Sequence, residues 1–325
     1  MSTTGHSGTR EASAPRPKPP RNVAIIGNPI ARDSGRCVTA VVRECCRLGL
    51  PVLSNLTTSV SDPGYGQARR AVAAGADLVV VVGGDGTIRQ VVRALAGTQV
   101  ALGVIACGTG NLLAHNLGLP RRGAHDQAAA VIGGSVVRID VGWASGESTH
   151  GPWGEEPFVT MAGIGRDART VACTGLSDKR RLGWWAYGVS GLAEARRRAL
   201  PMRVQIDDEE PRDVLTWTVL VGNTPAGPGR IRIWPHARPD DGVLDVLEVP
   251  IRHMGEWLAV ADKGLVHYDR EARALRYAQG RRIAVHPSWP LPVQLDGDVV
   301  QGVTELRVRV EHRGLAVCVP RSGPA

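Results

Sequence analysis

The chain has 325 residues, of which 43% are apolar and 22% are charged, the composition of a soluble globular protein with room for two domains. The formal net charge of +8 comes almost entirely from arginine. A basic protein can bind anionic membranes, phosphorylated substrates or nucleic acid. No basic block is interleaved with aromatic residues in a nucleic-acid-reading motif, so the sequence disfavours nucleic acid as a partner. No apolar run approaches the roughly 18 residues of a membrane span, so any membrane contact is expected to be peripheral.

The six cysteines show no C-x-x-C spacing and no accompanying histidine cluster. This pattern favours neither zinc binding nor a disulfide framework, and it predicts reduced thiols in the cytoplasm. Residues 1–20 are rich in Ser, Thr, Pro and Arg and lack an apolar core segment. They are predicted to be a disordered tail and not a signal peptide.

From residue 23 the sequence alternates strand-like and helix-like segments. The predicted strands are residues 23–26, 51–56, 78–82 and 100–105, and the predicted helices are residues 39–48, 67–74, 88–95 and 112–117. Such alternation predicts a parallel, doubly wound sheet, here an α/β domain over residues 21–141. In sheets of this kind, ligands bind beyond the carboxyl ends of the strands.

After residue 140 the segments become short and β-rich, separated by proline, glycine and acidic turns. The predicted strands are residues 203–206, 215–221, 231–234, 244–249, 282–285 and 306–310, with one helical segment at residues 182–198. This pattern predicts an antiparallel β-sandwich as a second domain, over residues 142–313.

Glycine-rich loops follow two of the predicted parallel strands. Gly83, Gly84, Asp85, Gly86 and Thr87 lie between a buried strand and a helix. Glycines allow the backbone to approach a phosphate, and the free N–H groups of the first helical turn then face the negative charge. The loop matches neither a Walker A motif nor G-x-G-x-x-G, and a tight turn remains the structural alternative.

A second loop of this kind contains Gly108, Thr109, Gly110 and Asn111, one strand later in the chain. A third polar loop, residues 28–35, follows the first strand. All three are predicted at the same edge of the sheet, where they can converge on one ligand.

The chain resembles the diacylglycerol kinase catalytic-domain family, in particular the soluble bacterial lipid kinases, from residue 23 to residue 320. The resemblance is carried by five motifs in order: residues 83–87, 108–111, 163–168 (Gly-Ile-Gly-Arg-Asp-Ala), 240–244 (Asp-Asp-Gly-Val-Leu) and 295–298 (Leu-Asp-Gly-Asp). The first motif alone is shared with NAD kinases, whereas the ordered set is highly specific.

The resemblance implies an N-terminal domain that binds ATP and a sandwich that helps to hold the lipid. It implies transfer of the γ-phosphate to the hydroxyl of a diacylglycerol-like or sphingoid lipid. It also implies that the last strand, residues 315–319, returns to the first domain, so that residues 314–325 would belong there. Asn28 and Thr57 are assigned to nucleotide contacts by the same resemblance.

Three acidic residues are candidates for the phosphoryl-transfer chemistry. Asp85 cannot bind a phosphate directly, so it is expected to face Mg²⁺, with helix capping as the alternative. Asp296 is the predicted general base, although Asp-Gly between strands is also a common hairpin signal. Asp298 stands where the family usually has glutamate, and Leu112 stands where many relatives have aspartate, so an acidic network there would be smaller.

Thr109 and Asn111 suit hydrogen bonds to ribose or phosphate, or capping of the helix that follows. The resemblance further implies a structural Mg²⁺ held by the Asp241 carboxylate and by the carbonyls of Arg238 and Val243, with a plain turn as the alternative. Asp140, at the end of a strand, is a candidate for the same acidic network.

Membrane contact is expected at a basic and aromatic segment: Lys179, Arg180, Arg181, Trp184, Trp185 and Tyr187. An ordinary amphipathic helix that packs on the sandwich is the alternative. Two other functions remain open for the whole chain, an NAD kinase and a non-catalytic nucleotide-binding regulatory module.

Overall fold

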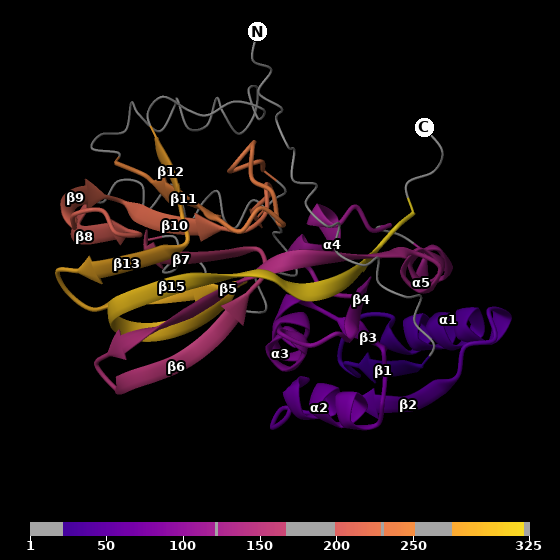
Figure 1. Cartoon of the computed structure of the whole chain (residues 1–325). Coiled ribbons are helices and arrows are strands. Elements are labelled where there is room, and N and C mark those ends of the chain that lie inside the picture. Colours follow the sequence, from indigo (N-terminus) through magenta and orange to yellow (C-terminus); the bar gives the residue numbers. More distant parts are fainter. Residues whose placement is uncertain (1–21, 121–122, 167–198, 229–230, 251–274, 322–325) are drawn as a thin grey trace, which may run out of the picture.

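The structure is a computed structural model that describes residues 22–120, 123–166, 199–228, 231–250 and 275–321. The predicted tail, the predicted helix at residues 182–198 and the basic and aromatic segment at residues 179–187 lie outside the described residues. Figure 1 shows two parts side by side, an α/β part drawn in indigo and purple and a β-rich part drawn mainly in magenta, orange and yellow.

The α/β part is built on four parallel strands in the order β2–β1–β3–β4. Their bounds are Val23–Gly27 for β1, Val52–Thr57 for β2, Leu78–Gly83 for β3 and Ala101–Ala106 for β4. β1 and β3 are buried at every position, as their uninterrupted apolar sequences require, whereas the edge strand β2 alternates between exposed and half-buried residues. The predicted parallel sheet is therefore confirmed.

Helices cover both faces of this sheet. α1 (Ser34–Arg47) packs against α5 (Ala124–Ile132) on one side, and α2 (Tyr65–Ala73) packs against α3 (Asp85–Leu95) on the other (Figure 1). The short helix α4 (Leu112–Asn116) follows β4. Each helix buries an apolar stripe, and the result is one continuous core around β1, β3 and β4.

The β-rich part is a two-layered sandwich. One layer has the order β12–β11–β10–β7–β14, and the other is formed by β9, β8, β13, β15, β5 and β6. Their bounds are β5 Ser135–Ser148, β6 Gly151–Phe158, β7 Met161–Gly165, β8 Leu200–Ile206, β9 Arg212–Thr216, β10 Thr218–Gly222, β11 Leu244–Glu248, β12 Arg276–Gly280, β13 Arg282–Pro287, β14 Leu291–Leu295 and β15 Asp298–Val319. A second apolar core lies between the layers, so the predicted sandwich class is confirmed.

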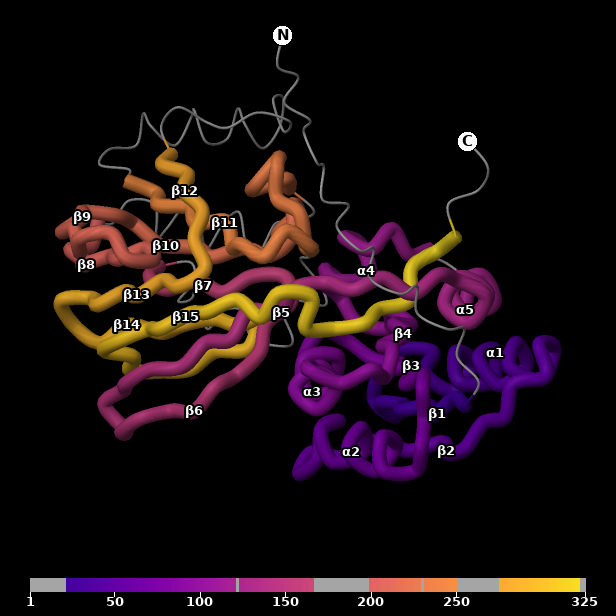
Figure 2. Tube along the Cα trace, viewed as in Figure 1, coloured from indigo at the N-terminus to yellow at the C-terminus, as the bar shows by residue number. Residues whose placement is uncertain are grey.

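Two long antiparallel strands, β5 and β15, belong to both parts. Their pairing is interrupted between Glu311 and Leu315, after which the last residues of β15 also pair with β4 in parallel. Figure 2 shows the yellow tube of β15 passing from the sandwich to the α/β part. Because β5 runs through residue 142, the domain boundary near that residue stays a prediction.

Several predicted elements need correction. Residues 231–234 are not a strand: Arg232 forms only an isolated bridge to Ala226, and Trp234 is buried in a small separate cluster. Residues 215–221 are two strands, because the chain changes partners at Trp217. α1 begins at Ser34, five positions before the predicted residue 39, and α5, β6, β12 and β14 were not predicted.

Candidate active site

The three polar loops meet at the carboxyl edge of the parallel sheet. The loop after β1 reaches the loop after β3, because Asn28 Nδ2 donates to Thr87 Oγ1 at 3.1 Å. The loop after β3 reaches the loop after β4, because Cys107 N donates to Gly83 O at 2.9 Å. The predicted nucleotide-binding loops therefore form one surface.

Glycine is required where the loop after β3 crosses the loop after β4. A Cβ on Gly108 would lie 2.7 Å from the Gly84 Cα, and a Cβ on Gly110 would lie 2.7 Å from Asp85 Oδ2. Both distances are shorter than any normal carbon contact, so larger residues would force the loops apart. The two glycine-rich loops are thus packed backbone against backbone.

Asp85 is the first residue of α3, and its carboxylate ties the two glycine-rich loops together. Oδ2 accepts the N–H of Asn111 at 2.8 Å, and Oδ1 accepts the N–H of Leu112 at 3.0 Å. Asp85 therefore caps α4, the helix of the neighbouring loop, which neither sequence interpretation foresaw. Burial first, and the nearby charge of Asp296 second, raise the pKa of Asp85 to about 6.

Three other residues were predicted to contact the nucleotide: Asn111, Thr109 and Thr57. Asn111 occupies a left-handed backbone conformation, and its side chain closes a ring with Gly108 through bonds of 2.9 and 2.7 Å instead of capping α4. Thr109 is exposed on the same loop. Thr57 is exposed at the end of β2, where its carbonyl accepts a bond from Gln67.

Asp296 lies in the two-residue turn between β14 and β15, with Gly297. Both residues have positive φ, 47° and 96°, as in a type I′ hairpin turn. The Asp-Gly hairpin signal is thus correct, yet the aspartate side chain is buried and not solvated.

The buried Asp296 carboxylate is surrounded by donors from the segment between β6 and β7. Oδ2 accepts the N–H of Val159 at 2.8 Å, whereas Oδ1 accepts the N–H of Thr160 at 3.0 Å, that of Met161 at 2.9 Å and the Thr160 hydroxyl. Burial raises the pKa of Asp296, and these hydrogen bonds, led by that of the Thr160 hydroxyl, oppose the rise.

Asp298 points toward the glycine-rich loop at residues 83–87 but is paired with an arginine. Its Oδ2 accepts both Nε and Nη2 of Arg89, at 2.9 and 2.7 Å. A Cβ on Gly86 would lie 3.6 Å from Asp298 Oδ1. The Asp298 carboxylate therefore borders this glycine-rich loop, and the Arg89 guanidinium of α3 balances its charge.

The predicted structural magnesium site lies at the turn before β11. Asp241 is exposed and its Oδ1 accepts the N–H of Val243 at 3.2 Å, while Arg238 lies 3.5 Å from the Asp240 carboxylate. Among the described residues, no group of three or more His, Cys, Asp or Glu side chains is arranged to hold a metal. A cation at this turn would therefore depend on one carboxylate, carbonyls and water, a ligand set that Mg²⁺ accepts.

Asp140 connects that turn to the interruption in the long strand pair. Its fully buried carboxylate accepts the N–H of Gly242 at 2.7 Å and the N–H of Arg313 at 2.6 Å, and it contacts His312 Nδ1 at 3.0 Å. These bonds satisfy the N–H of Arg313, which the irregular pairing leaves without a strand partner, and that of Gly242 in the turn before β11. Asp140 is thus a structural junction between the two parts.

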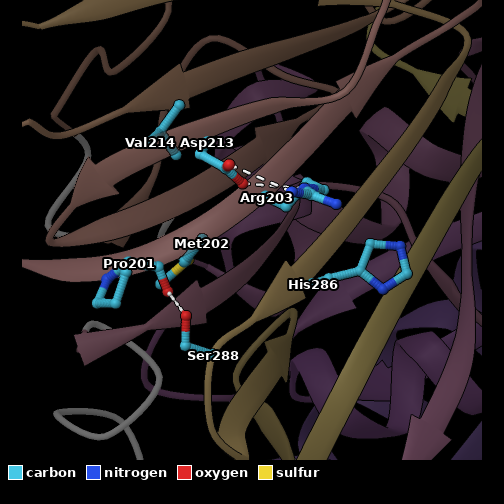
Figure 3. Close-up of a pocket in the computed structure, with 7 residues that line it drawn as sticks. All are labelled: Pro201, Met202, Arg203, Asp213, Val214, His286 and Ser288. Carbon is cyan, nitrogen blue, oxygen red and sulfur yellow. Dashed lines mark hydrogen bonds and ion pairs between the residues drawn. The ribbon is translucent and has the colours of Figure 1, made fainter.

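A cavity of about 590 Å³ lies elsewhere, on β8, β9 and β13 (Figure 3). Its walls include the ion pair of Arg203 and Asp213, with His286 beyond it, and none of the predicted site residues. We therefore assign the candidate site to the glycine-rich loops and the Asp296 turn.

Sequence reasoning missed Thr160, Arg89 and Glu156. Thr160 is the hydroxyl donor to Asp296, and Arg89 links Asp298 to Glu156. Their partners lie 67 to 209 positions away in the chain, so no local pattern could have revealed them.

Family comparisons agree with this geometry. The model of the diacylglycerol kinase catalytic domain matches residues 23–144, and that of the YegS C-terminal NAD kinase beta sandwich-like domain matches residues 160–319. A diacylglycerol kinase from Mycobacterium tuberculosis (strain CDC 1551 / Oshkosh) is 34% identical over 233 residues, 69% of this chain and 72% of that protein. One from Bacillus subtilis (strain 168) is 27% identical over 288 residues, 86% and 90% of the two chains.

A solved structure from Bacillus anthracis str. Sterne superposes with a TM-score of 0.74, covering 96% of this chain and 98% of the other. At 22% identity that match shows the fold alone. The fold and the family matches define a two-domain kinase with glycine-rich loops at the edge of a parallel sheet. The chain belongs to the diacylglycerol kinase catalytic-domain family and is a lipid kinase.

No helix among the residues that the structure describes is both long and apolar enough to span a bilayer.

Proposed function

We propose that the protein transfers the γ-phosphoryl group of ATP, in an Mg²⁺-dependent reaction, to the hydroxyl of a diacylglycerol-like or sphingoid lipid at a membrane surface. One observation carries the proposal: the Asp296 turn of the sandwich borders residues 83–87, the proposed phosphate loop, because a Cβ on Gly86 would lie 3.6 Å from Asp298 Oδ1. In agreement with this, the charge of Asp296 adds to the effect of burial in raising the pKa of Asp85. Two acids from different parts of the chain thus share one site. The names of the relatives support a lipid acceptor.

The phosphates of ATP would lie on the backbone N–H groups of residues 83–87 and of the loop at 108–111. The start of α3 adds its partial positive charge, and glycines permit the approach. Asn28 Nδ2 donates to the Thr87 hydroxyl oxygen, which leaves the O–H of Thr87 free to donate to a phosphate.

Asp296 would accept the proton of the lipid hydroxyl. The hydroxyl oxygen attacks the γ-phosphorus at the same time, and ADP leaves. Oδ1 already accepts three hydrogen bonds and Oδ2 only one. Oδ2 is therefore the oxygen with capacity for the proton. The raised pKa of Asp296 makes it a stronger base than a solvated aspartate.

The acidic residues fit a cation that arrives with the nucleotide. Each Asp85 oxygen accepts one N–H from the neighbouring loop, which leaves lone pairs for a cation or its water. Asp85 would hold Mg²⁺ there, directly or through water. The ion would neutralise charge on the transferred phosphoryl group.

The test is to incubate the purified protein with γ-labelled ATP, Mg²⁺ and vesicles of a total bacterial lipid extract, then identify the labelled species. We expect label in a phospholipid, with Asp296→Asn slower by about 10²- to 10⁴-fold. Parallel tubes contain NAD or no acceptor. Label in NADP would support the NAD kinase alternative, and no transfer to any acceptor would support a regulatory module.

A further inference from the structure

Four charged side chains join α3 to the sandwich beside the candidate site. Arg89 donates Nε and Nη2 to Asp298 and donates Nη1 to Glu156 Oε2 at 2.9 Å. Arg93, one turn later, contacts Glu156 Oε1 at 2.8 Å. The Arg93 guanidinium also lies 5.5 Å from the centre of the Tyr65 ring of α2, so the network extends across both helices on that face.

The geometry of this network differs from that of surface ion pairs. The Arg89 side chain is only 10% exposed, and its planar fork engages two carboxylates from separate strands. Exposed pairs contribute little, whereas an enclosed arginine held by several charge-assisted bonds fixes orientation. Removing one member would leave partly buried charges without a partner.

The network touches the elements that carry the two candidate acids. α3 begins at Asp85, one turn before Arg89, and Asp298 follows Asp296 by two residues. The β14–β15 turn and α3 have no other hydrogen bond to each other among the described residues. Among the described residues, Arg89 therefore supplies the side-chain hydrogen bonds that hold this turn against α3.

We propose that Arg89, Glu156 and Asp298 form a clamp that positions the phosphate loop opposite Asp296, with Arg93 supporting Glu156. The inference rests on the proposed function, since the clamp would serve phosphoryl transfer across that gap. Asp298 is then a positioning residue that acts through Arg89. The clamp requires a carboxylate at position 298 and a guanidinium at position 89.

The decisive variant is Arg89→Lys, which keeps the charge but cannot hold two carboxylates in one plane. Because small misplacements of reacting groups are costly, we expect kcat to fall by about 10- to 100-fold. KM for ATP should change by less than about threefold, since the N–H groups of the phosphate loop remain. Asp298→Asn should behave likewise, and Asp298→Glu, which keeps a carboxylate, should stay within about threefold of the parent.

Arg212→Lys is the matched control. Arg212 of β9 pairs with Glu248 of β11 at 3.0 Å, is partly buried and lies wholly within the sandwich. This variant should lose stability as Arg89→Lys does and yet keep the parent kcat. A parent-like kcat for Arg89→Lys, or an equal fall in both variants, would overturn the clamp.

Hydrogen exchange supplies a readout that needs no activity. α3 covers β6, the strand that carries Glu156, so loss of the clamp should speed amide exchange in β6 by about threefold or more relative to Arg212→Lys. If the parent phosphorylates no lipid, the proposed function fails while exchange still decides the clamp. Equal exchange in β6 of both variants would refute it.

Discussion

The Thr160 hydroxyl offers the sharpest test of the role of Asp296. This hydroxyl donates to Asp296 Oδ1, and of the hydrogen bonds that lower the pKa of Asp296 it has the largest effect. Thr160→Val replaces it with a methyl group of similar size in a buried position. The two backbone donors to Oδ1, from residues 160 and 161, remain.

The magnitude follows from the energy of one bond to a charged group. Such a bond contributes about 1.5–3 kcal/mol, and about 1.4 kcal/mol corresponds to one pH unit in a titration. Losing the bond favours the protonated carboxyl group, so the pKa of Asp296 rises. The acid limb of the kcat–pH profile should therefore move upward by about one to two pH units.

The assay is kcat from pH 5 to pH 9 on lipid vesicles at saturating ATP, with the parent, Thr160→Val and Thr160→Ser. Thr160→Ser keeps a hydroxyl and should match the parent profile. At high pH all three should turn over at similar rates, because Asp296 is then ionised in each. Superimposable profiles for Thr160→Val and Thr160→Ser would refute the assignment of Asp296 as the proton acceptor.

Three further outcomes follow from the geometry. Gly108→Ala places a methyl group 2.7 Å from the Gly84 Cα, so KM for ATP should rise about tenfold. The control is Gly154→Ala, whose methyl group meets no atom within 4 Å and which should match the parent in the same assay. Asp140→Asn puts an amide N–H₂ against backbone donors, so urea unfolding should show a loss of about 2–4 kcal/mol; an unchanged midpoint would contradict its structural role. The pKa of Asp85 is about 6 in the folded chain against 3.8 for a free aspartate. Its contribution to stability is therefore fully present below about pH 4 and is lost as pH rises to 6. Relative to Asp85→Asn the parent should lose about 2 kcal/mol between pH 4 and pH 6, and parallel stability curves would contradict the burial of its charge.

The parallel sheet was predictable because its information is local. The apolar run of β3 and the glycines that follow it specify a buried strand and a tight turn within ten residues. The same holds for β1 and β4. The positions of the phosphate loops followed, since parallel strands place their carboxyl ends together.

The wrong predictions concern segments whose structure depends on which strand they pair with. Residues 231–234 alternate like a strand, but Pro235 follows at once and Trp234 fills a separate apolar cluster instead of joining a ladder. Residues 306–310 and 315–319 were predicted as separate strands, but both belong to β15. In the structure Arg313, with φ of 50°, forms an irregularity within one long strand, and Asp140 satisfies its N–H.

In the candidate site, too, local motifs were predictable and tertiary contacts were not. Asp85 and Asp296 were accessible through motifs, yet their surroundings were not. The donors of Asp296 come from a segment about 136 positions earlier, and the cap that Asp85 provides serves the helix of another loop. A motif identifies a reactive group, whereas its pKa depends on contacts that only the tertiary fold creates.

The topology explains how two acids from separate parts can be held close despite their repulsion. β15 begins at Asp298, beside the Asp296 turn, and ends paired with β4, the neighbour of the strand that leads into Asp85. One continuous strand therefore anchors the sandwich acid to the sheet of the phosphate loop. Backbone N–H groups stabilise each carboxylate separately, while burial first and the remaining repulsion from Asp296 second raise the pKa of Asp85.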